Sequence, residues 1–382
     1  MMRKKLLVFG QPDIRKEDAD EVLDSLKSLW IGTGPKVAQF EDKLKKYMGA
    51  PFAVAVSSCT AALHLSLLAA GIKSGDEVIT TPLTFAATAN VILHVGAKPA
   101  FVDVDKHTAL VEPSLIERAI TSKTKAIMPV HLCGRPCEMD EIMRIARKWK
   151  LVVIEDAAHA VEAIYKGKRI GTIGDFTCFS FYVNKNVTTC EGGMVTTKRQ
   201  DSSELIRTLA HHGLSLTAWE RMKGVSTYEV VEPGYKYNLT DINAALGLHQ
   251  LDRIESSWKR RREIWGRYND AFKKFACWTP PDVQDGCVHA YHLYTLFIDV
   301  ERIGKSRDEV RKKLYELNIG TGIHYISLHL HPYYRDAFGY EPDDFPNARW
   351  ISERTLSLPL SPALTDEDVD DVIDAVKKVL KV

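Results

Sequence analysis

From about residue 50 to about residue 200 the chain repeats one arrangement, in which a short apolar run is followed by a stretch with helical spacing. The runs are apolar along most of their length instead of at alternate positions, which indicates strands that are buried on both faces. Such strands are typical of parallel sheets in α/β proteins. The runs cover residues 52–56, 77–81, 100–104, 126–130, 151–154, 177–181 and 194–197, and the helical patterns include residues 60–70, 113–120 and 139–148. We therefore expect a large doubly wound α/β domain, in which ligands bind at the carboxyl ends of the strands.

The pattern changes after residue 200. Thr240 is expected to cap a long helix over residues 241–272, and Thr365 is expected to cap a last helix over residues 366–380. Between them the sequence predicts strands at residues 292–300 and 319–325 and a helix at residues 307–317. We expect a large domain of residues 1–250, with an extended N-terminal segment, and a small C-terminal α+β domain of residues 251–382, led by the long connecting helix.

Composition excludes several classes of function. The chain has 51 Lys and Arg against 50 Asp and Glu, so it lacks the excess of positive charge that nucleic acids and anionic membranes attract. We interpret the basic run at residues 259–262 as a solvated helix face. The seven cysteines are odd in number and scattered, which favours reduced thiols in a cytoplasmic protein without a metal site. No apolar run is long enough to span a bilayer, and the run near the N-terminus is too short for a signal peptide.

Three stretches carry candidate chemistry. The first is Ser57-Ser58-Cys59-Thr60-Ala61-Ala62, where a strand ends and a helix begins. The free amides and the positive dipole at a helix N-terminus suit a phosphate group. An ordinary strand–turn–helix has the same pattern, so this stretch alone does not identify a phosphate site.

The second stretch is Leu151 to His159, an apolar strand that ends in Glu155 and Asp156. A carboxylate at the end of a buried strand is desolvated unless it is paired. A cationic heterocycle would pair it, and a carboxylate beside a pyridine nitrogen keeps that nitrogen protonated. A surface aspartate at a strand end and a packing histidine at position 159 are the alternatives.

The third stretch is a polar loop after the 177–181 run, and it contains one lysine, Lys185. A lysine that forms a Schiff base must be unprotonated for part of the time, and partial burial lowers its pKa. A lone lysine is usually a surface residue. A phosphate cradle, a buried acid and, 29 residues after that acid, a loop lysine together match the parts of a pyridoxal phosphate (PLP) site.

In these three stretches, and in others along its length, the chain resembles the DegT/StrS-type sugar aminotransferases, a branch of the fold-type-I PLP enzymes. The resemblance covers nearly the whole chain, from residues 30–35 to residues 352–362, and includes residues 75–79, 155–160 and 234–245. Residues 56–60 and 234–245 are most similar to the UDP-4-amino-4-deoxy-L-arabinose transaminase branch. The resemblance implies a mixed, mostly parallel sheet in the large domain.

The resemblance also implies roles for individual residues. Lys185 matches the Schiff-base lysine, Asp156 the carboxylate on the pyridinium nitrogen, and His159 a residue beside the ring hydroxyl; these are the expected catalytic residues. The other expected cofactor contacts are Thr60, Ala61 and Ser180 at the phosphate, Phe85 stacked on the ring, and Asn238 reaching the phosphate of the neighbouring subunit. Asn238 therefore implies a homodimer with shared active sites. Thr33, Tyr182, His324 and Tyr325 match stretches that line the sugar-nucleotide cleft.

Some positions depart from the family pattern. Tyr182 stands where relatives commonly have His, Asn184 precedes the lysine, and Cys190 stands where Gly is common. These departures concern the sugar pocket. Members in which histidine replaces the lysine are dehydratases, and the presence of Lys185 argues against that branch.

The expected function is transfer of an amino group from L-glutamate to a nucleotide-linked 4-keto sugar, with UDP as the expected carrier, in polysaccharide or lipopolysaccharide biosynthesis. One alternative is a PLP aminotransferase that acts on a cyclitol or another ketone without a nucleotide. Another, of a different class, is a non-catalytic regulator built on the same fold.

Overall fold

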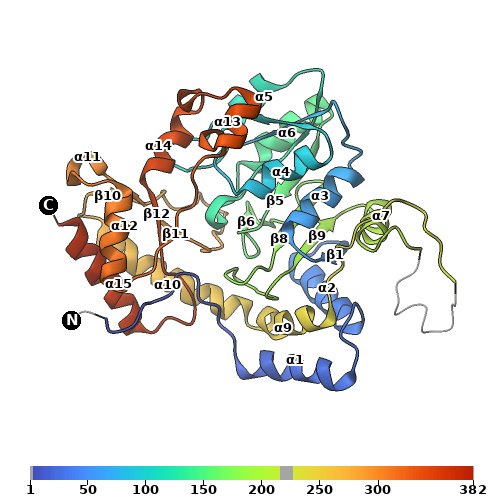
Figure 1. Cartoon of the computed structure of the whole chain (residues 1–382), viewed down its shortest axis with the longest axis horizontal. Coiled ribbons are helices and arrows are strands. Elements are labelled where there is room, and N and C mark those ends of the chain that lie inside the picture. Colours follow the sequence, from blue (N-terminus) through green and yellow to red (C-terminus); the bar gives the residue numbers. More distant parts are fainter. Residues whose placement is uncertain (1–2, 216–226, 382) are drawn as a thin grey trace.

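In residues 3–215 and 227–381, which the computed structural model describes, a seven-stranded sheet forms the centre of the larger part of the chain (Figure 1). The strand β9 runs antiparallel to both of its neighbours, and the remaining neighbours pair in parallel. The predicted mixed, mostly parallel sheet is confirmed. In spatial order the strands are β1 (Phe52–Val56), β9 (Gly193–Thr197), β8 (Phe176–Ser180), β5 (Val152–Asp156), β4 (Thr124–Ile127), β2 (Glu77–Thr80) and β3 (Lys98–Phe101).

Helices cover both faces of this sheet, and successive side chains of its strands, except the edge strand β3, enter two different hydrophobic clusters. In β1, Ala53 and Ala55 belong to one cluster and Val54 and Val56 to the other. The first cluster includes side chains of α2 (Pro35–Met48), α5 (Pro113–Ala119), α6 (Met139–Trp149) and α9 (Asp241–Asp252). The second includes side chains of α3 (Cys59–Ala69), α4 (Ala86–His94) and α7 (Gln200–Ala210). Burial on both faces is therefore what made the strands apolar throughout.

The C-terminal part has its own hydrophobic cluster and a three-stranded antiparallel sheet. The sheet contains β10 (Cys277–Trp278), β11 (Tyr294–Ile298) and β12 (Thr355–Leu358), and the helices that pack with it include α10 (Ile254–Phe272), α12 (Arg307–Glu316) and α15 (Asp366–Leu380). Leu7 lies in this cluster and forms a bridge with Ile319, so the N-terminal segment contacts the C-terminal part. Both ends of the described chain lie beside α15 in Figure 1. The division at residues 250 and 251 stays a prediction.

Shorter elements connect these parts. They are α1 (Lys16–Ser28), α11 (Val300–Ile303), α13 (Pro332–Phe338), α14 (Pro346–Arg354), β6 (Ile164–Tyr165), β7 (Lys168–Arg169), and the 3-10 turns Leu132–Gly134, Leu328–Leu330 and Pro342–Asp344. The two predicted caps are confirmed. Thr240 Oγ1 accepts a hydrogen bond from the amide of Asn243, and Thr365 forms a capping box with Asp368.

Three expectations need correction. The long helix predicted over residues 241–272 is two helices, because Arg253 has φ −106° and ψ 11° and ends α9 before α10 begins. Residues 319–325 form isolated bridges and no strand, since only Ile319 and Gly322 pair with another segment. The run at residues 259–262 is not wholly solvated, because Arg261 is fully buried against Glu162.

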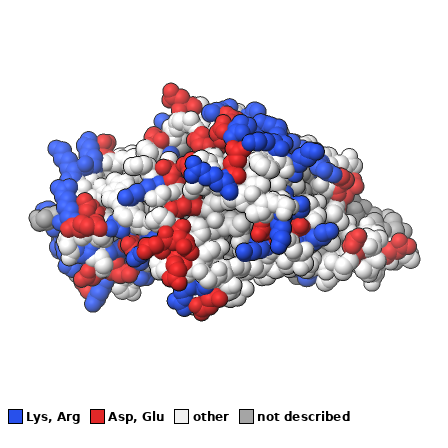
Figure 2. Space-filling view, turned by 90° about the horizontal axis from the view of Figure 1, so that it is seen from above, with Lys and Arg blue, Asp and Glu red and all other residues white. Residues whose placement is uncertain are grey.

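Charges of both signs lie close together over much of the face shown in Figure 2, as the nearly equal numbers of acidic and basic residues suggest. Within residues 3–215 and 227–381, no helix has both the length and the apolar character needed to cross a membrane. The same ranges contain no group of three or more His, Cys, Asp or Glu side chains arranged to hold a metal ion. All seven cysteines are free thiols.

Candidate active site

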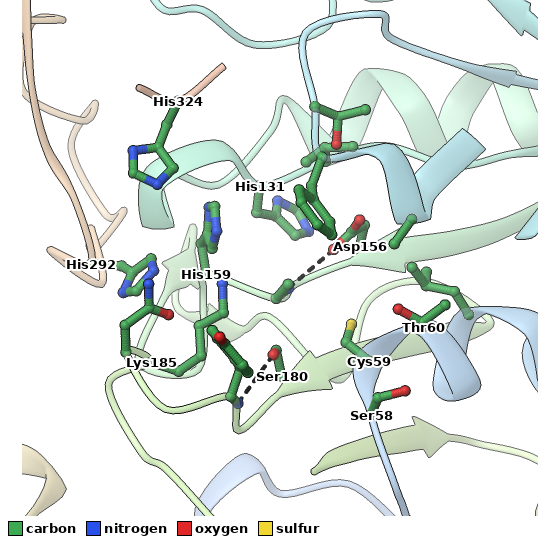
Figure 3. A pocket seen from close by; sticks show the side chains of 18 of the residues that line it. Ser58, Cys59, Thr60, His131, Asp156, His159, Ser180, Lys185, His292 and His324 are labelled. Carbon is green, nitrogen blue, oxygen red and sulfur yellow. Dashed lines mark hydrogen bonds between the residues drawn. The ribbon is translucent and has the colours of Figure 1, made fainter. Parts of the chain in front are cut away.

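A cavity of about 450 Å³ lies where β5 and β8 end, at the carboxyl edge of the large sheet (Figure 3). That is the place where doubly wound sheets bind ligands. Nine of the predicted site residues line the cavity: Thr60, Phe85, Asp156, His159, Ser180, Tyr182, Lys185, His324 and Tyr325. Three do not, namely Ala61, Thr33 and Asn238.

The N-terminus of α3 forms one wall of the cavity. The Ser58 hydroxyl caps this helix by accepting a 3.0 Å hydrogen bond from the amide of Ala61. The amide of Ala61 therefore already donates a hydrogen bond, and Ala61 does not line the cavity. The cap leaves the first amides of the helix, those of Cys59 and Thr60, to face an anion.

Strand β9 approaches this helix end very closely. A Cβ atom on Gly193 would lie 2.4 Å from the carbonyl carbon of Ser58 and 2.6 Å from the amide nitrogen of Cys59. Only glycine allows this approach, so the sequence pair Gly192-Gly193 shapes the wall next to the anion-binding amides.

The two acids at the end of β5 have different surroundings, because neighbouring strand residues point to opposite faces. Glu155 is fully buried and satisfied: it accepts hydrogen bonds from the amide of Gly174 and the hydroxyl of Thr177 and contacts His131 Nε2 at 2.9 Å. Asp156 lines the cavity instead. Glu155 therefore stabilises the sheet, and Asp156 is available to a ligand.

Asp156 is a buried carboxylate without an ion pair among residues 3–215 and 227–381. Its Oδ2 accepts a 2.7 Å hydrogen bond from Thr88, whose hydroxyl also contacts Thr84, and its Oδ1 accepts one from the amide of Ala158. Burial raises the pKa of Asp156, while the hydrogen bond from Thr88 opposes that rise. Such a carboxylate suits a ligand that brings a positive charge.

Lys185 extends into the same cavity from the loop after β8. The loop turns tightly here, since the amide of Lys185 donates to the carbonyl of Tyr182 at 2.9 Å. Burial of the amine lowers the pKa of Lys185 to about 8. A lysine with this pKa is partly unprotonated near neutral pH, as a nucleophilic lysine must be.

His159 has one tautomer set by the backbone. The amide of Cys133 donates to its Nδ1 at 3.2 Å, so the ring proton of the neutral imidazole is on Nε2. Burial lowers the pKa of His159 well below its usual value, which keeps the ring neutral. Nε2 lies 3.2 Å from the hydroxyl of Tyr325 and can donate to an oxygen there.

The mouth of the cavity carries exposed aromatic side chains. Phe85 is 60% exposed at the start of α4, and its ring centre is 6.0 Å from that of Tyr325. Tyr182 is 46% exposed on the lysine loop. His324 lies deeper and contacts the hydroxyl of Ser357 at 2.8 Å. Aromatic faces at a cavity mouth are suited to stacking against a planar ligand.

Thr33 and Asn238 contact each other away from this cavity. The amide group of Asn238 donates to Thr33 Oγ1 at 2.6 Å, and Thr33 Oγ1 donates to the carbonyl of Leu239. The contact of Asn238 with the cofactor phosphate of a neighbouring subunit stays a prediction.

Several cavity residues were not identified from the sequence. They include Thr84, Glu191, Gly192 and His292, with Thr88 behind Asp156. Ser58 and Cys59 belong to the stretch identified as a candidate phosphate site, but they had no individual roles. The N-cap position of Ser58 was visible as a Ser before a helix. His292 had no local signal, because it joins the cavity only through the tertiary fold.

The residues present fit PLP. Helix amides suit its phosphate, the unpaired buried carboxylate of Asp156 suits a protonated pyridine nitrogen, and the amine of Lys185 suits its aldehyde. The cavity volume falls within the usual range for cofactor sites.

Comparison with known proteins agrees with this arrangement. Residues 12–377 match the DegT/DnrJ/EryC1/StrS aminotransferase family. The spore coat polysaccharide biosynthesis protein SpsC from Bacillus subtilis is 50% identical, with 99% of this chain and 98% of SpsC aligned. An uncharacterised protein from Methanocaldococcus jannaschii is 53% identical, with 100% of this chain and 99% of that protein aligned.

Solved structures match over nearly the whole chain as well. Spr1654 from Streptococcus pneumoniae, assigned as a sugar aminotransferase, has a TM-score of 0.91 and 36% identity in its apo form, with 98% of this chain and 97% of that one covered. It has also been solved in a PMP form and a PLP form. PseC from Helicobacter pylori, an aminotransferase involved in pseudoaminic acid biosynthesis, has a TM-score of 0.91 and 27% identity, with 99% of both chains covered.

Proposed function

Because this chain belongs to the DegT/DnrJ/EryC1/StrS aminotransferase family, we propose that it transfers the amino group of L-glutamate to a nucleotide-linked 4-keto sugar. It is a PLP-dependent sugar aminotransferase by family and by its structural neighbours. The donor, the keto group at C4 and the nucleotide, for which we expect UDP, are the proposed part. The observation that carries the proposal is one cavity that holds the amine of Lys185, the unpaired carboxylate of Asp156 and the capped end of α3.

When bound, PLP supplies an electron sink that weakens the bonds at the carbon bearing the amino group. The protein's own residues supply binding and proton transfer. The amides of Cys59 and Thr60 and the Ser180 hydroxyl hold the phosphate, and Asp156 holds a proton on the ring nitrogen. Thr88 fixes the orientation of that carboxylate by its 2.7 Å hydrogen bond.

Lys185 is the group we assign to proton transfer. Its pKa of about 8 allows the amine both to accept a proton from the donor's α-carbon and to return it to the product. His159 presents Nε2–H and donates a hydrogen bond to an oxygen of the cofactor ring or of Tyr325. The burial of both groups excludes bulk water from the reacting atoms.

The sugar side of the proposal rests on the mouth of the cavity and on the relatives. Phe85 and Tyr182 are exposed aromatic side chains where an incoming substrate must pass. The role of SpsC in spore coat polysaccharide biosynthesis supports a product that enters a polysaccharide. Tyr182, Thr33, His324 and Tyr325 remain proposed substrate contacts.

The test follows the visible absorption band of the purified, PLP-loaded enzyme. L-Glutamate should bleach the band, whereas L-alanine and L-aspartate serve as donor controls. After the amino acid is removed, UDP-, dTDP- and GDP-linked 3- and 4-keto sugars are added, and the return of the band is timed. Rapid return with a UDP-linked 4-keto sugar is the expected result, and the Lys185→Ala variant should show no such cycle.

Other outcomes select the alternatives. If glutamate bleaches the band and only a keto-cyclitol restores it, the enzyme acts on a ketone without a nucleotide. If neither amino acids nor ketones change the band, the chain would be a non-catalytic regulator on this fold, even though Lys185 and Asp156 are intact.

A further inference from the structure

Four histidines, His131, His159, His292 and His324, line the cavity together with Lys185 (Figure 3). His292 is almost fully buried, and its ring centre is 4.5 Å from that of His159. The proposed function assigns no role to His292. Its hydrogen bonds, followed outward from the cavity, lead to a buried ion pair.

The ion pair joins Arg261 of α10 to Glu162, and both side chains are 2% exposed. Burial raises the pKa of Glu162, and the adjacent guanidinium group of Arg261 opposes that rise. Arg261 cannot lose its proton at any ordinary pH, so it holds the partner carboxylate in the charged, accepting form. Glu162 can then only accept hydrogen bonds from its other neighbours.

Asn186, the residue after Lys185, is oriented by this carboxylate. Its Nδ2 donates to Glu162 Oε2 at 2.7 Å and to the carbonyl of Ala290 at 2.9 Å. Both partners are acceptors, so the amide nitrogen must face them and the amide cannot be flipped. Asn186 Oδ1 is therefore fixed on the other side as an acceptor.

His292 receives its tautomer from Asn186. Its Nδ1 lies 3.0 Å from Asn186 Oδ1, and that contact requires a proton on Nδ1. Burial lowers the pKa of His292 well below its usual value, so the ring carries only this one proton. Nε2 is thus a bare acceptor, and it has no hydrogen-bond partner among residues 3–215 and 227–381. His159 has the opposite tautomer, with its proton on Nε2.

Lys185 offers the matching donor. Its amine also has no hydrogen-bond partner in the described part of the chain, and it lies among the same cavity walls as His292. The two groups interact electrostatically, since the charge of Lys185 is among the causes that lower the pKa of His292, after burial itself. Figure 3 shows Lys185, His159 and His292 gathered on one side of the cavity, opposite Thr60.

We propose that His292 is a positioning residue for Lys185: its bare Nε2 accepts a hydrogen bond from the lysine amine once that amine has been released from the bound cofactor. The buried chain Arg261–Glu162–Asn186 fixes the tautomer that makes this possible. The inference rests on the proposed function only for the chemical role of Lys185.

The test uses the full-length protein loaded with pyridoxamine phosphate and without substrate, so that the amine of Lys185 is free beside the cofactor. Trace acetylation with acetic anhydride, followed by mass spectrometry of the Lys185 peptide, gives the pH midpoint at which this amine becomes reactive. The wild-type midpoint is expected below that of an exposed lysine, because the amine is buried. An acceptor stabilises the ammonium form, so His292→Phe should lower the midpoint by about one pH unit. His292→Gln keeps an acceptor and should restore most of that difference.

A matched pair of variants separates the relay from general destabilisation. Glu162→Gln breaks the ion pair at the start of the chain and should lower the midpoint part of the way. Asp18→Asn breaks another buried ion pair, that of Asp18 with Arg253, which does not lead to His292, and should leave the midpoint unchanged. An unchanged midpoint in His292→Phe, or equal shifts in Glu162→Gln and Asp18→Asn, would overturn the proposal.

A second measurement needs no destabilised variant. In protein labelled with ¹⁵N-histidine, long-range proton–nitrogen spectra at about pH 7.5 report the protonated nitrogen of each imidazole. We expect His292 with a protonated Nδ1 and a bare Nε2, assigned by its disappearance in His292→Gln. An Nε2–H tautomer or an imidazolium would contradict the proposal. Because neither measurement involves glutamate or a sugar, a wrong substrate assignment would leave both results unaffected.

Discussion

Glu155 and Asp156 are adjacent in the sequence and point to opposite faces of β5, where one is locked into the sheet and the other faces the cavity. Glu155 accepts from Gly174 and Thr177 and pairs with His131, whereas Asp156 has no cationic partner in the described ranges. Because side chains alternate between the two faces of a strand, one acid stabilises the sheet and its neighbour is available to a ligand.

Replacing Asp156 by Asn should lower kcat by roughly two to three orders of magnitude, because removing one member of a buried charge pair costs about 2–5 kcal/mol. Pre-steady-state rates with L-glutamate measure the effect. The matched variant Glu155→Gln should keep the activity per folded molecule within about threefold and lower the free energy of unfolding by about 1–3 kcal/mol in urea. The amide of that Gln would face the proton on His131 Nε2, since His131 Nδ1 accepts from Cys137. Equal losses of activity in the two variants would contradict the division of roles.

The rate at which PLP attaches to the cofactor-free protein should depend on the ionisation of Lys185. Burial lowers the pKa of this amine from its ordinary value of 10.5 to about 8, and only the neutral form attacks an aldehyde. The rate should therefore rise about tenfold per pH unit below pH 8 and level off above it. Stopped-flow absorbance between pH 7 and pH 10 measures this profile, with Lys185→Arg as the control that forms no covalent link. A rate that still rises steeply above pH 9 would mean that the amine is not perturbed.

Within one basic run, Arg261 and Lys259 should differ sharply in their effect on stability. Arg261→Met leaves the buried charge of Glu162 unpaired and should cost about 3–5 kcal/mol in the free energy of unfolding. Lys259 is exposed on the same helix, and Lys259→Met should change stability by no more than about 0.5 kcal/mol. Denaturant unfolding of both variants tests this. Similar values would mean that the whole run is solvated.

A methyl group on Gly193 should disturb the end of α3. The new Cβ would lie 2.4 Å from a backbone atom of Ser58, so Gly193→Ala has to displace β9 or the helix end. We expect at least a tenfold weaker Kd for PLP and a stability loss of about 1–3 kcal/mol, as for other overpacked sites. Gly266, in α10, has no atom within 4 Å of such a Cβ. Gly266→Ala should therefore stabilise the protein by roughly 0.5–1 kcal/mol. Unchanged PLP affinity in Gly193→Ala would show that the end of α3 does not bind the phosphate.

If Asn238 serves the partner's site, two inactive variants should complement each other. Co-expressed Lys185→Ala and Asn238→Ala subunits, carrying different affinity tags, would form mixed dimers in which one site has both changes and the other has neither. Random pairing predicts recovery of about a quarter of the wild-type active sites. That figure applies to the unseparated mixture, and the purified mixed dimer, with one intact site of two, should have about half of the wild-type activity. No recovery in mixed dimers that bind PLP would place Asn238 outside the shared site.

Burial, more than strand pairing, is what the sequence pattern reports. The runs predicted at residues 100–104 and 126–130 extend past the ends of β3 and β4, which end at Phe101 and Ile127. The additional residues include Val104 and Met128, and both are fully buried without belonging to a strand. An apolar run thus marks the core, and burial continues for a few residues past the end of the strand. Caps were predictable for a different reason, because Thr240 and Thr365 bond within their own first turn.

The site was predictable where it depends on residues near one another in the chain, and not where it depends on the tertiary fold. Asp156 ends a strand, and Thr60 and Lys185 follow one, so a sheet brings them to one edge. Arg261 looked like one more charge on a solvated helix, since Glu162 is far away in sequence. His292 stayed unnoticed for the same reason. Its partners come from the lysine loop and from α10 through Glu162, and no local spacing indicates them.

The contact of Leu7 with Ile319 has a consequence for how the chain is made on the ribosome. Leu7 is synthesised well before its bridging partner and much of the surrounding cluster, including Val376 and Val379, which come roughly 300 residues later. At ordinary rates of translation that interval is on the order of 15–60 s. During it the large sheet can already form, while Leu7 waits without the surface on which it packs. Synthesis of this later cluster therefore determines when Leu7 can pack.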